Sequence, residues 1–467
     1  MAKIQLVGAS NQQRSMPFSA QRTVNLIPLV DKQGAEPTSF LGTPGLTVFA
    51  TAGGGAIRSE IISANGRMFC VSGGDLYEIS SAGVATLRGT LLSTSGICTM
   101  AENSTQLAIC DQTYLYIFTY STNTFARVTD ADFPSVVSTV DFIDSYLVVV
   151  EANTGKFFIS ALANGTAWAA LDFATAESSP DNLRRAINSF GQLLLFGENT
   201  LEIWRNTGDS DFPFSRVSGA VPVGTLSPFS VINIDTSVFW VGNTLQGSGI
   251  VYKAQGFTPV RISTDYIERL LQAETSPELL YSWSYQQDGH TYMVISGGSL
   301  ETSLCYDLST QLWHERAYLN ADGTFDQHRG SCAIRAFNKT LVGDRVTGKI
   351  YTLSQDVYAD DGNPLKWLRV FTHLVDELKN IRYSTLNVGF EVGVGLQTGQ
   401  GSAPTVSLRV SKDGARTWSN FITASLGAAG KYTQIVKFRR LGVARKCTFE
   451  LSGSDPVKTA ITGAYLS

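Results

Sequence analysis

The chain has 467 residues, of which 43% are hydrophobic and only 16% are charged. The length suffices for two or three ordinary domains, and the apolar fraction suffices to bury a substantial core. The formal net charge is −4, from 36 basic and 40 acidic residues. A protein that reads a nucleic-acid sequence carries a strongly basic surface, and this charge balance argues against such a protein. The balance is compatible with a protein that surrounds DNA without binding it tightly.

Cysteine usage and the start of the chain indicate the compartment. Six cysteines lie far apart and mostly inside apolar stretches, so we expect free thiols and assembly in a cytoplasm. They are Cys70, Cys98, Cys110, Cys305, Cys332 and Cys447. The start, MAKIQLVGAS, lacks the apolar core of a signal peptide, and no window approaches the roughly 18 apolar residues of a membrane span. We therefore expect a soluble protein that does not insert into a membrane.

Residues 1–50 contain four prolines and show little periodicity. This composition predicts an extended arm that is ordered by contact with something else. On this prediction, deleting residues 1–30 leaves the propeller folded and impairs docking.

A hairpin pattern then repeats along residues 51–360. Each copy is an apolar strand, a turn and a returning strand with alternating side chains. The seven copies begin at Met68, Leu107, Tyr146, Leu193, Val238, Thr291 and Thr340. Their mean spacing, about 45 residues, is that of a propeller blade of four strands. The sequence predicts an all-β fold whose main domain is a β-propeller of six or seven blades; a sandwich, a solenoid and a large barrel stay as alternatives.

One helix is expected inside this region. Asp265 can cap it, Glu268 lies three residues later, and an apolar face follows. Pro277 stops any continuation, so we expect a short packing element between blades.

After residue 360 the hairpin period is lost. Longer alternating strands follow, at Thr405–Ser411, Tyr432–Arg440 and Cys447–Ser452. Residues 361–467 therefore form a separate β-sandwich-like module in this prediction, after the arm (1–50) and the propeller (51–360).

No catalytic, metal or cofactor motif is found. The four histidines lack a compact ligand spacing, and no nucleophile elbow or P-loop occurs. The run Trp313-His314-Glu315-Arg316 is most simply the closing strand of a blade. Ser411–Trp418 approximates the Asp-box of sialidase propellers, in which the Asp caps a hairpin turn, so even this motif is structural. We expect no enzyme activity and no cofactor.

A basic patch lies in the C-terminal module. Its members are Lys437, Arg439, Arg440, Arg445 and Lys446. They are either the solvated face of a strand pair or a contact with an acidic partner surface or passing DNA phosphates. The same two interpretations, a solvated surface or a contact with an acidic partner or DNA, apply less strongly to the pair Arg184-Arg185.

The order of several short motifs resembles the packaged-DNA stabilisation, or tail hub (tail nozzle), family of short-tailed bacteriophages (podoviruses). The segments that carry the resemblance run from about residue 20 to the end: residues 21–28 (QRTVNLIP), 44–46, 182–228, 251–268, 289–290, 306–307, 313–316 and 411–418.

The resemblance implies a structural virion protein of the phage tail with no active site. It implies a propeller that assembles as a ring, most often a homohexamer, below the portal and its adaptor ring. Such a ring extends and closes the DNA channel, retains packaged DNA, lets double-stranded DNA pass without specific binding, and offers attachment to tail fibres or tailspikes. The expected location is the virion tail, after assembly in the bacterial host cytoplasm.

Two regions are candidate partner contacts: the N-terminal segment and the loop of residues 206–228, which does not repeat. The residues singled out are Arg14, Phe18, Arg22, Asp209, Phe212 and Phe214. The alternative function is a carbohydrate-binding or receptor-binding propeller of a tail, which exposed aromatic residues on one loop face would favour. A propeller enzyme, the third possibility, would require clustered carboxylates in the central funnel.

Overall fold

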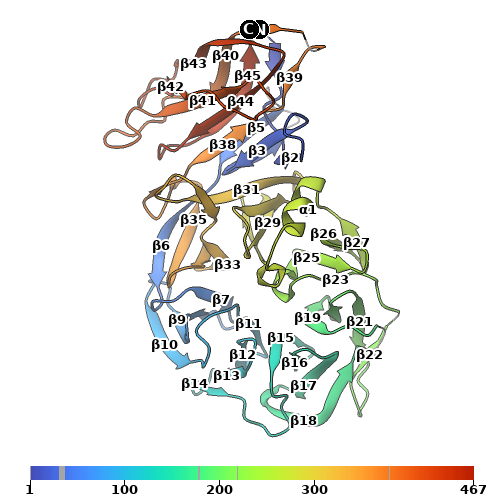
Figure 1. Ribbon diagram of the computed structural model, residues 1–467. Helices are drawn as coiled ribbons and strands as arrows, with labels where there is room; N and C mark the ends of the chain where they lie inside the picture. Colours follow the sequence, from blue (N-terminus) through green and yellow to red (C-terminus); the bar gives the residue numbers. More distant parts are fainter. Residues whose placement is uncertain (1, 31–36, 177–178, 218, 378) are drawn as a thin grey trace.

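The computed structural model describes residues 2–30, 37–176, 179–217, 219–377 and 379–467. In this part of the chain, seven units of four antiparallel strands follow one another around a central axis (Figure 1). The prediction of an all-β protein with a β-propeller and a C-terminal β-sandwich is confirmed, and the uncertain blade number is seven.

The first four blades are formed by consecutive segments. Blade 1 contains β7 (Ile57–Ile62), β8 (Met68–Ser72), β9 (Asp75–Ile79) and β10 (Ala85–Thr90). Blade 2 contains β11 (Thr99–Glu102), β12 (Gln106–Cys110), β13 (Leu115–Thr119) and β14 (Thr124–Arg127). Blade 3 contains β15 (Val137–Ile143), β16 (Tyr146–Glu151), β17 (Lys156–Ala161) and β18 (Asn164–Thr175). Blade 4 contains β19 (Leu183–Ser189), β20 (Gln192–Gly197), β21 (Leu201–Asn206) and β22 (Phe214–Arg216).

The last three blades carry additional short elements. Blade 5 contains β23 (Gly224–Thr225), the 3-10 turn η1 (Pro228–Ser230), β24 (Ile232–Ile234), β25 (Ser237–Thr244), β26 (Gly247–Gln255) and β27 (Thr258–Arg261). The turn η2 (Pro277–Leu279) precedes blade 6, which contains β28 (Tyr281–Gln287), β29 (His290–Ser296), β30 (Ser303–Asp307), β31 (Leu312–Leu319) and β32 (Phe325–Gln327). Blade 7 contains β33 (Gly330–Ala336), β34 (Lys339–Asp344), β35 (Lys349–Ser354) and β6 (Gly45–Thr51), with β36 (Ala359–Asp360) and β37 (Asn363–Pro364) at its rim.

Each of the seven predicted hairpins is the middle pair of a blade. The pairs are β8–β9, β12–β13, β16–β17, β20–β21, β25–β26, β29–β30 and β34–β35. Their side chains are buried on both faces because each blade packs against its two neighbours, as in the core shared by blades 3 and 4. The repeat is therefore the part of the sequence that forms the core.

The ring is closed by strands from both ends of the propeller segment. β33, β34 and β35 come from its end, whereas the outermost strand of blade 7, β6, precedes blade 1. β6 pairs antiparallel with β35 from Gly45 to Thr51. Opening the ring therefore requires breaking a full strand pair, not only a side-chain contact.

The C-terminal module is a two-sheet sandwich at the outer edge of blade 6. One sheet contains β4 (Leu26–Val30), β5 (Thr38–Gly42), β45 (Ala460–Leu466), β40 (Ile381–Phe390) and β43 (Val436–Ala444), with β1 (Ala2–Ile4) paired to β45. The other contains β3 (Ala20–Val24), β38 (Trp367–Val370), β44 (Lys446–Gly453), β41 (Thr405–Ser411) and β42 (Ile422–Ser425), with β2 (Asn11–Gln12) on β3 and β39 (Leu374–Val375) on β44. Apolar side chains of both sheets meet in one core. The predicted strand at 432–440 begins later, at Val436.

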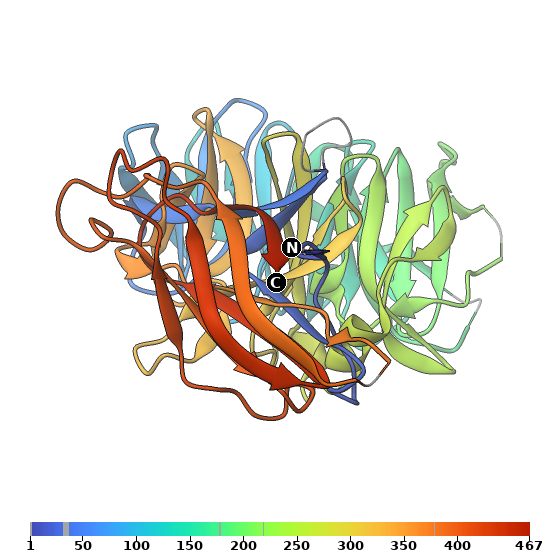
Figure 2. The same cartoon turned by 90° about the horizontal axis from the view of Figure 1, so that it is seen from above.

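The N-terminal segment differs from the predicted extended arm. Its described residues form β1 to β5 inside the sandwich and β6 inside the propeller. The two chain ends lie side by side because β1 pairs with β45 (Figures 1 and 2). β3 pairs with β31 of blade 6 on one edge and with β38 on the other, so blade 6 and one sandwich sheet are continuous.

The predicted helix is α1 (Asp265–Gln272), but its cap differs from the expectation. Thr264, not Asp265, is the N-cap residue, and its side chain makes no capping hydrogen bond. Glu268 instead accepts hydrogen bonds from Arg261 and Ser263. The buried face of α1 lies in a core formed by blades 5 and 6, as expected for a packing element between blades.

Candidate functional site: the propeller–sandwich junction and its flanking surfaces

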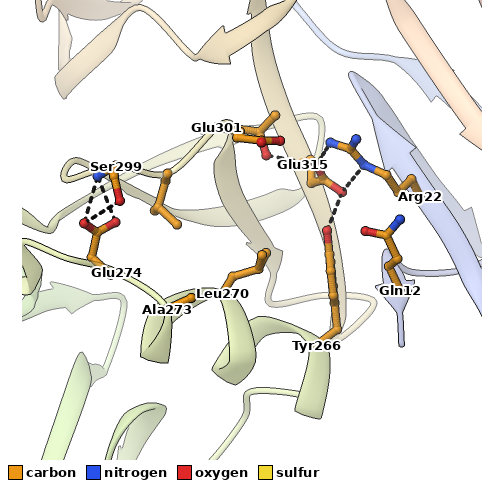
Figure 3. Close-up of a pocket in the computed structure, with 11 residues that line it drawn as sticks. Gln12, Arg22, Tyr266, Leu270, Ala273, Glu274, Ser299, Glu301 and Glu315 are labelled. Carbon is orange, nitrogen blue, oxygen red and sulfur yellow. Dashed lines mark hydrogen bonds and ion pairs between the residues drawn. The ribbon is translucent and has the colours of Figure 1, made fainter. Parts of the chain in front are cut away.

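A buried carboxylate stands where the N-terminal segment meets the propeller. Glu315, on β31, is 1% exposed and lies beside Arg22 of β3 and Tyr266 of α1 (Figure 3). Arg22 forms a two-point ion pair with Glu315, in which its Nε donates to Oε1 and its Nη2 donates to Oε2. Ser10 and Thr302 each donate a hydroxyl hydrogen bond of 2.9 Å to it. Four segments of the chain therefore meet on one side chain.

These contacts determine the ionisation of the group. Burial alone would raise the pKa of Glu315, but the Arg22 guanidinium and the donated hydrogen bonds outweigh it and lower the pKa below its ordinary value. The Glu315 carboxylate in turn raises the pKa of Arg22. Both groups stay charged, and removing either one leaves the other without its partner in a buried place.

Two further buried side chains fix the same junction. The Asn25 side chain donates 2.8 Å hydrogen bonds to the carbonyls of Ala317 in blade 6 and Lys366 before the sandwich, and it accepts one from the Ala317 N–H. Its φ of 53° lies in the left-handed region, which Asn tolerates better than most residues. On the sandwich side, the fully buried Arg369 binds the Leu6 carbonyl at 2.8 Å and the Thr23 hydroxyl at 2.8 Å.

The junction borders a pocket of about 300 Å³ between β2, α1 and blade 6 (Figure 3). Its second carboxylate, Glu274, accepts hydrogen bonds from the N–H and hydroxyl of Ser299 and from the N–H of Ser276. Burial raises the pKa of Glu274, but these hydrogen bonds lower it overall. Hydrogen-bond donors therefore keep Glu274 and Glu315, two of the three glutamates that line this pocket, in the ionised form.

The run Trp313–Arg316 lies on β31, the closing strand of blade 6, as predicted. All four side chains are buried, because β3, α1 and blade 7 cover this strand. Burial and the neighbouring Arg316 lower the pKa of His314 to about 3. Arg316 donates to the Tyr285 hydroxyl at 2.6 Å. This is a packed strand and not a catalytic cluster.

Within the described residues, no three His, Cys, Asp or Glu side chains are placed to hold a metal ion. His290 and Asp307 form a single 2.8 Å contact that joins β29 to β30. No helix in the described part of the chain is long and apolar enough to span a membrane.

The Asp-box at Ser411–Trp418 is a turn cap, as predicted. The Asp413 carboxylate accepts hydrogen bonds from the Ser411 hydroxyl, the N–H of Arg416, and the N–H and hydroxyl of Thr417. These donors hold its pKa well below the ordinary value. Arg409 stacks over the Trp418 ring at 5.1 Å, which fixes the end of the turn.

The structure separates the six candidate contact residues into two groups. Arg14, Phe18 and Asp209 are on the surface, and Phe18 is 80% exposed. Arg22 belongs to the buried ion pair. Phe214 is 3% exposed and, with Phe212, packs against blade 3 side chains, so these two aromatics contribute to the core of blades 3 and 4.

The predicted basic patch follows β43, which is an edge strand of its sheet. Lys437, Arg439, Arg440 and Arg445 are exposed, and Lys446 is half-buried. None of the five forms an ion pair within the described residues. Alternation explains the pattern, since Val436 and Phe438 point into the sandwich core and Lys437 and Arg439 point away from it.

Charge is divided unequally between the two domains. Residues 366–467 contain 14 basic and 6 acidic side chains, a net charge of +8. Residues 1–365 contain the other 22 basic and 34 acidic side chains, a net charge of −12, which together with +8 gives −4. Residues 366–467 supply most of the sandwich and are cationic, whereas the anionic remainder supplies the propeller together with β1 to β5 of the sandwich.

Comparison with protein families finds matches over nearly the whole chain. The family model described as bacteriophage P22 Gp10, beta-propeller, matches residues 2–358. The model described as bacteriophage P22 Gp10, beta-sandwich, matches residues 366–467. No curated protein sequence matches.

Solved structures show only distant likeness. The extracellular domain of BT4673 from B. thetaiotaomicron is 10% identical with a TM-score of 0.46, over 78% of this chain and 43% of that chain. The chain thus spans less than half of that protein's length. A chain of the Mitotic Checkpoint Complex is 10% identical with a TM-score of 0.42, over 67% and 93%. The computationally designed Ika8 protein is 13% identical with a TM-score of 0.39, over 75% and 99%.

Proposed function

Because the chain belongs to the bacteriophage P22 Gp10 family, a family of structural proteins of the phage tail, we propose that it forms the tail hub or nozzle ring. In this proposal the ring lies below the portal and its adaptor ring, extends and closes the DNA channel, and retains packaged DNA. The observation that carries the proposal is the match of both domains, in order, over residues 2–358 and 366–467.

We propose a homohexamer in which the sandwich of one copy faces the propeller of the next. The support is the charge division, +8 against −12, together with the row of unpaired cations on the β43 edge. Contacts between unlike surfaces generate a closed ring when the rotation between neighbours allows it. The rigid sheet that joins blade 6 to the sandwich would fix this rotation.

The acidic propeller supports a passive role towards DNA. A surface of net negative charge repels phosphates, so a duplex can slide past it without binding. The exposed turn at Arg14 and Phe18 and the exposed loop at Asp209 are proposed contacts for the adaptor ring and for a tail fibre or tailspike. Assembly would take place in the host cytoplasm, where the six free cysteines would stay reduced.

A mass measurement with electron microscopy tests the proposal. The purified chain is mixed with its cognate adaptor ring, and particle mass and shape are compared with those of each component alone. A ring of several copies coaxial with the adaptor is expected. A chain that stays monomeric in the presence of the adaptor would contradict the hub function.

The alternative of a carbohydrate-binding propeller gains no support. The exposed aromatic side chains are spread over both domains. Among the described residues they include Phe18, Phe190, Phe257, Phe421 and Tyr432.

A further inference from the structure

Residues on the innermost strands of the propeller, β7, β11, β19, β28 and β33, line a cavity. These strands surround the axis of the ring (Figure 1). The cavity has a volume of about 250 Å³. Side chains from blades 1, 2, 4, 6 and 7 line it, and Phe229 of η1 adds an apolar wall. Since one water molecule occupies about 30 Å³ in the liquid, the space holds a small ion together with several waters.

Arg185 of β19 lines this cavity, and no other side chain takes up its donors. The guanidinium makes no hydrogen bond and no ion pair of 4 Å or less with any described residue. Burial lowers its pKa, and the Asp141 carboxylate opposes this effect at longer range. The Nε of Arg185 is fully buried without a hydrogen-bond acceptor, which is unusual because such a donor loses water without replacement.

The nearby charges do not neutralise Arg185 by contact. Asp141 uses its two oxygens on the N–H groups of Phe142 and Asn188, at 2.7 and 3.0 Å. The other cation of the wall, Arg58, is fully engaged with the carbonyls of Gly73, Ser93 and Gly96 and with the Ser93 hydroxyl.

Three hydroxyl groups share the cavity with Arg185. Ser59 lies on β7, and Ser282 and Ser284 lie on β28. No side-chain hydrogen bond is formed by any of the three within the described residues. The cavity therefore combines one guanidinium and three hydroxyl donors from three different blades. This donor set matches an oxyanion, whose oxygens accept from a guanidinium fork and from hydroxyl groups.

We propose that the propeller holds one small oxyanion, a carboxylate or an inorganic phosphate or sulfate, in its central cavity, with Arg185 as the principal ligand. The bound anion would link blades 1, 4 and 6 across the axis. The site lies inside a single chain, so it does not depend on the ring proposed above.

Calorimetry tests the site directly. The full chain is dialysed into Tris chloride and titrated with sodium acetate, sodium phosphate or sodium sulfate at constant ionic strength. Saturable binding of one anion per chain is expected for at least one of the three probes, and the midpoint of thermal unfolding should rise with its concentration. The anion that binds most tightly shows whether the natural ligand is a carboxylate or an inorganic phosphate or sulfate.

Variants then assign the binding to Arg185. R185M should weaken binding by about tenfold or more, the usual effect of losing a hydrogen bond to a charged group. R185K should retain part of it, because Lys keeps the charge but loses the fork. The matched control is R184M, since the neighbouring Arg184 pairs with Glu198 at 3.1 Å and does not line the cavity. If R185M does not fold, S284A replaces it.

Three results would overturn the proposal. The first is the absence of saturable binding for all three probes. The second is binding that R185M, or S284A in its place, leaves unchanged. The third is an adventitious ion only, recognised by occupancy that appears only at molar concentration in a high-resolution structure.

Discussion

The propeller and the sandwich are both built from antiparallel sheets, yet they differ in charge and in how they use the chain. The anionic propeller is formed mainly by consecutive hairpins, so most of its strands pair with strands that lie close in the sequence. The cationic sandwich is assembled from both chain ends, with β1, β3, β4 and β5 beside strands that begin after residue 366. The boundary near residue 360, where the hairpin repeat ends in the sequence, therefore does not separate the two domains fully, because the strands β1 to β5 also belong to the sandwich.

This difference in chain use shows that the N-terminal segment connects the propeller to the sandwich. β3 is hydrogen-bonded to β31 of the propeller and to β38 of the sandwich. Glu315 and Arg369 then hold the same segment by charged contacts on opposite sides. We expect the relative orientation of the two domains to depend on the N-terminal segment more than on the linker near residue 365.

Deletion of residues 1–30 should have the largest effect. It removes β1 to β4, leaves the buried Glu315 without its Arg22 counter-charge, and leaves the buried Arg369 without its hydrogen-bond acceptors in the N-terminal segment. Each unpaired buried charge costs about 3–5 kcal/mol, and a whole domain is stable by about 5–15 kcal/mol, so the sandwich should not fold. Circular dichroism and limited proteolysis measure this. A deletion product that melts within a few degrees of the full chain would restore the extended-arm interpretation.

A control keeps that experiment specific. F18S alters the same segment at a side chain that is 80% exposed. It should leave the melting temperature unchanged, because exposed substitutions away from special contacts change stability by about 0.5 kcal/mol or less.

E315Q should have the next largest effect. It leaves the Arg22 guanidinium without a counter-charge, and we expect a loss of about 3 kcal/mol in the free energy of unfolding, the low end for a broken buried pair since Arg22 is partly exposed. Denaturant titration with urea measures it. The matched control is E391Q, whose partner Lys458 and own side chain are each 44% exposed, and which should cost less than about 1 kcal/mol.

The same pair predicts a pH dependence. The pKa of Glu315 is lower in the folded protein than in the unfolded chain. Its stabilising contribution should therefore be complete above the unfolded value of about 4.3 and should be lost as the pH falls through the lower folded value. The difference in stability between the native protein and E315Q should shrink on acidification. A constant difference from neutral to acidic pH would show that the charge of Glu315 is unimportant.

The propeller could be predicted because its information is local. A strand, a turn and a returning strand lie within 12 to 19 residues, and the pattern recurs about every 45 residues. The N-terminal segment could not be predicted in the same way. Arg22 meets Glu315 across 293 positions, and Arg369 meets Thr23 across 346. Neither the periodicity nor the composition of a short apolar segment indicates with which distant strand the segment will pair.

The candidate contacts show the same limit at the level of single residues. The aromatic residues of the 206–228 loop drew attention because the loop does not repeat, but Phe214 is a core residue of the blade 3–4 interface. The exposed row on β43 was recognisable because strand alternation is local. Arg369 was missed, although a single arginine inside the apolar run Trp367–Val370 is a signal that something polar lies opposite.

D413A tests a cap that belongs to the sandwich alone. It removes an acceptor for four hydrogen bonds at the turn after β41. We expect a loss of about 1 kcal/mol, the usual cost of losing a capping side chain, and no change in the propeller. Hydrogen exchange read separately for the two domains measures it. Equal loosening of both domains would mean that the shared sheet transmits the change, and the comparison drawn above would need revision.

Replacing the cations of the β43 edge should change the folding stability least and yet reveal what the charge difference does. In the double variant K437Q/R439Q both side chains are exposed and unpaired, so the free energy of unfolding should change by about 0.5 kcal/mol or less. If the edge faces the acidic propeller of a neighbouring copy, association should weaken, and added salt should weaken the native association towards the level of the variant. Sedimentation at two salt concentrations measures both effects.

K379Q is the matched control, because Lys379 is exposed but already paired with Glu377. Association that is insensitive both to the double variant and to salt would place the ring contact elsewhere and leave the +8 of residues 366–467 for a different acidic surface.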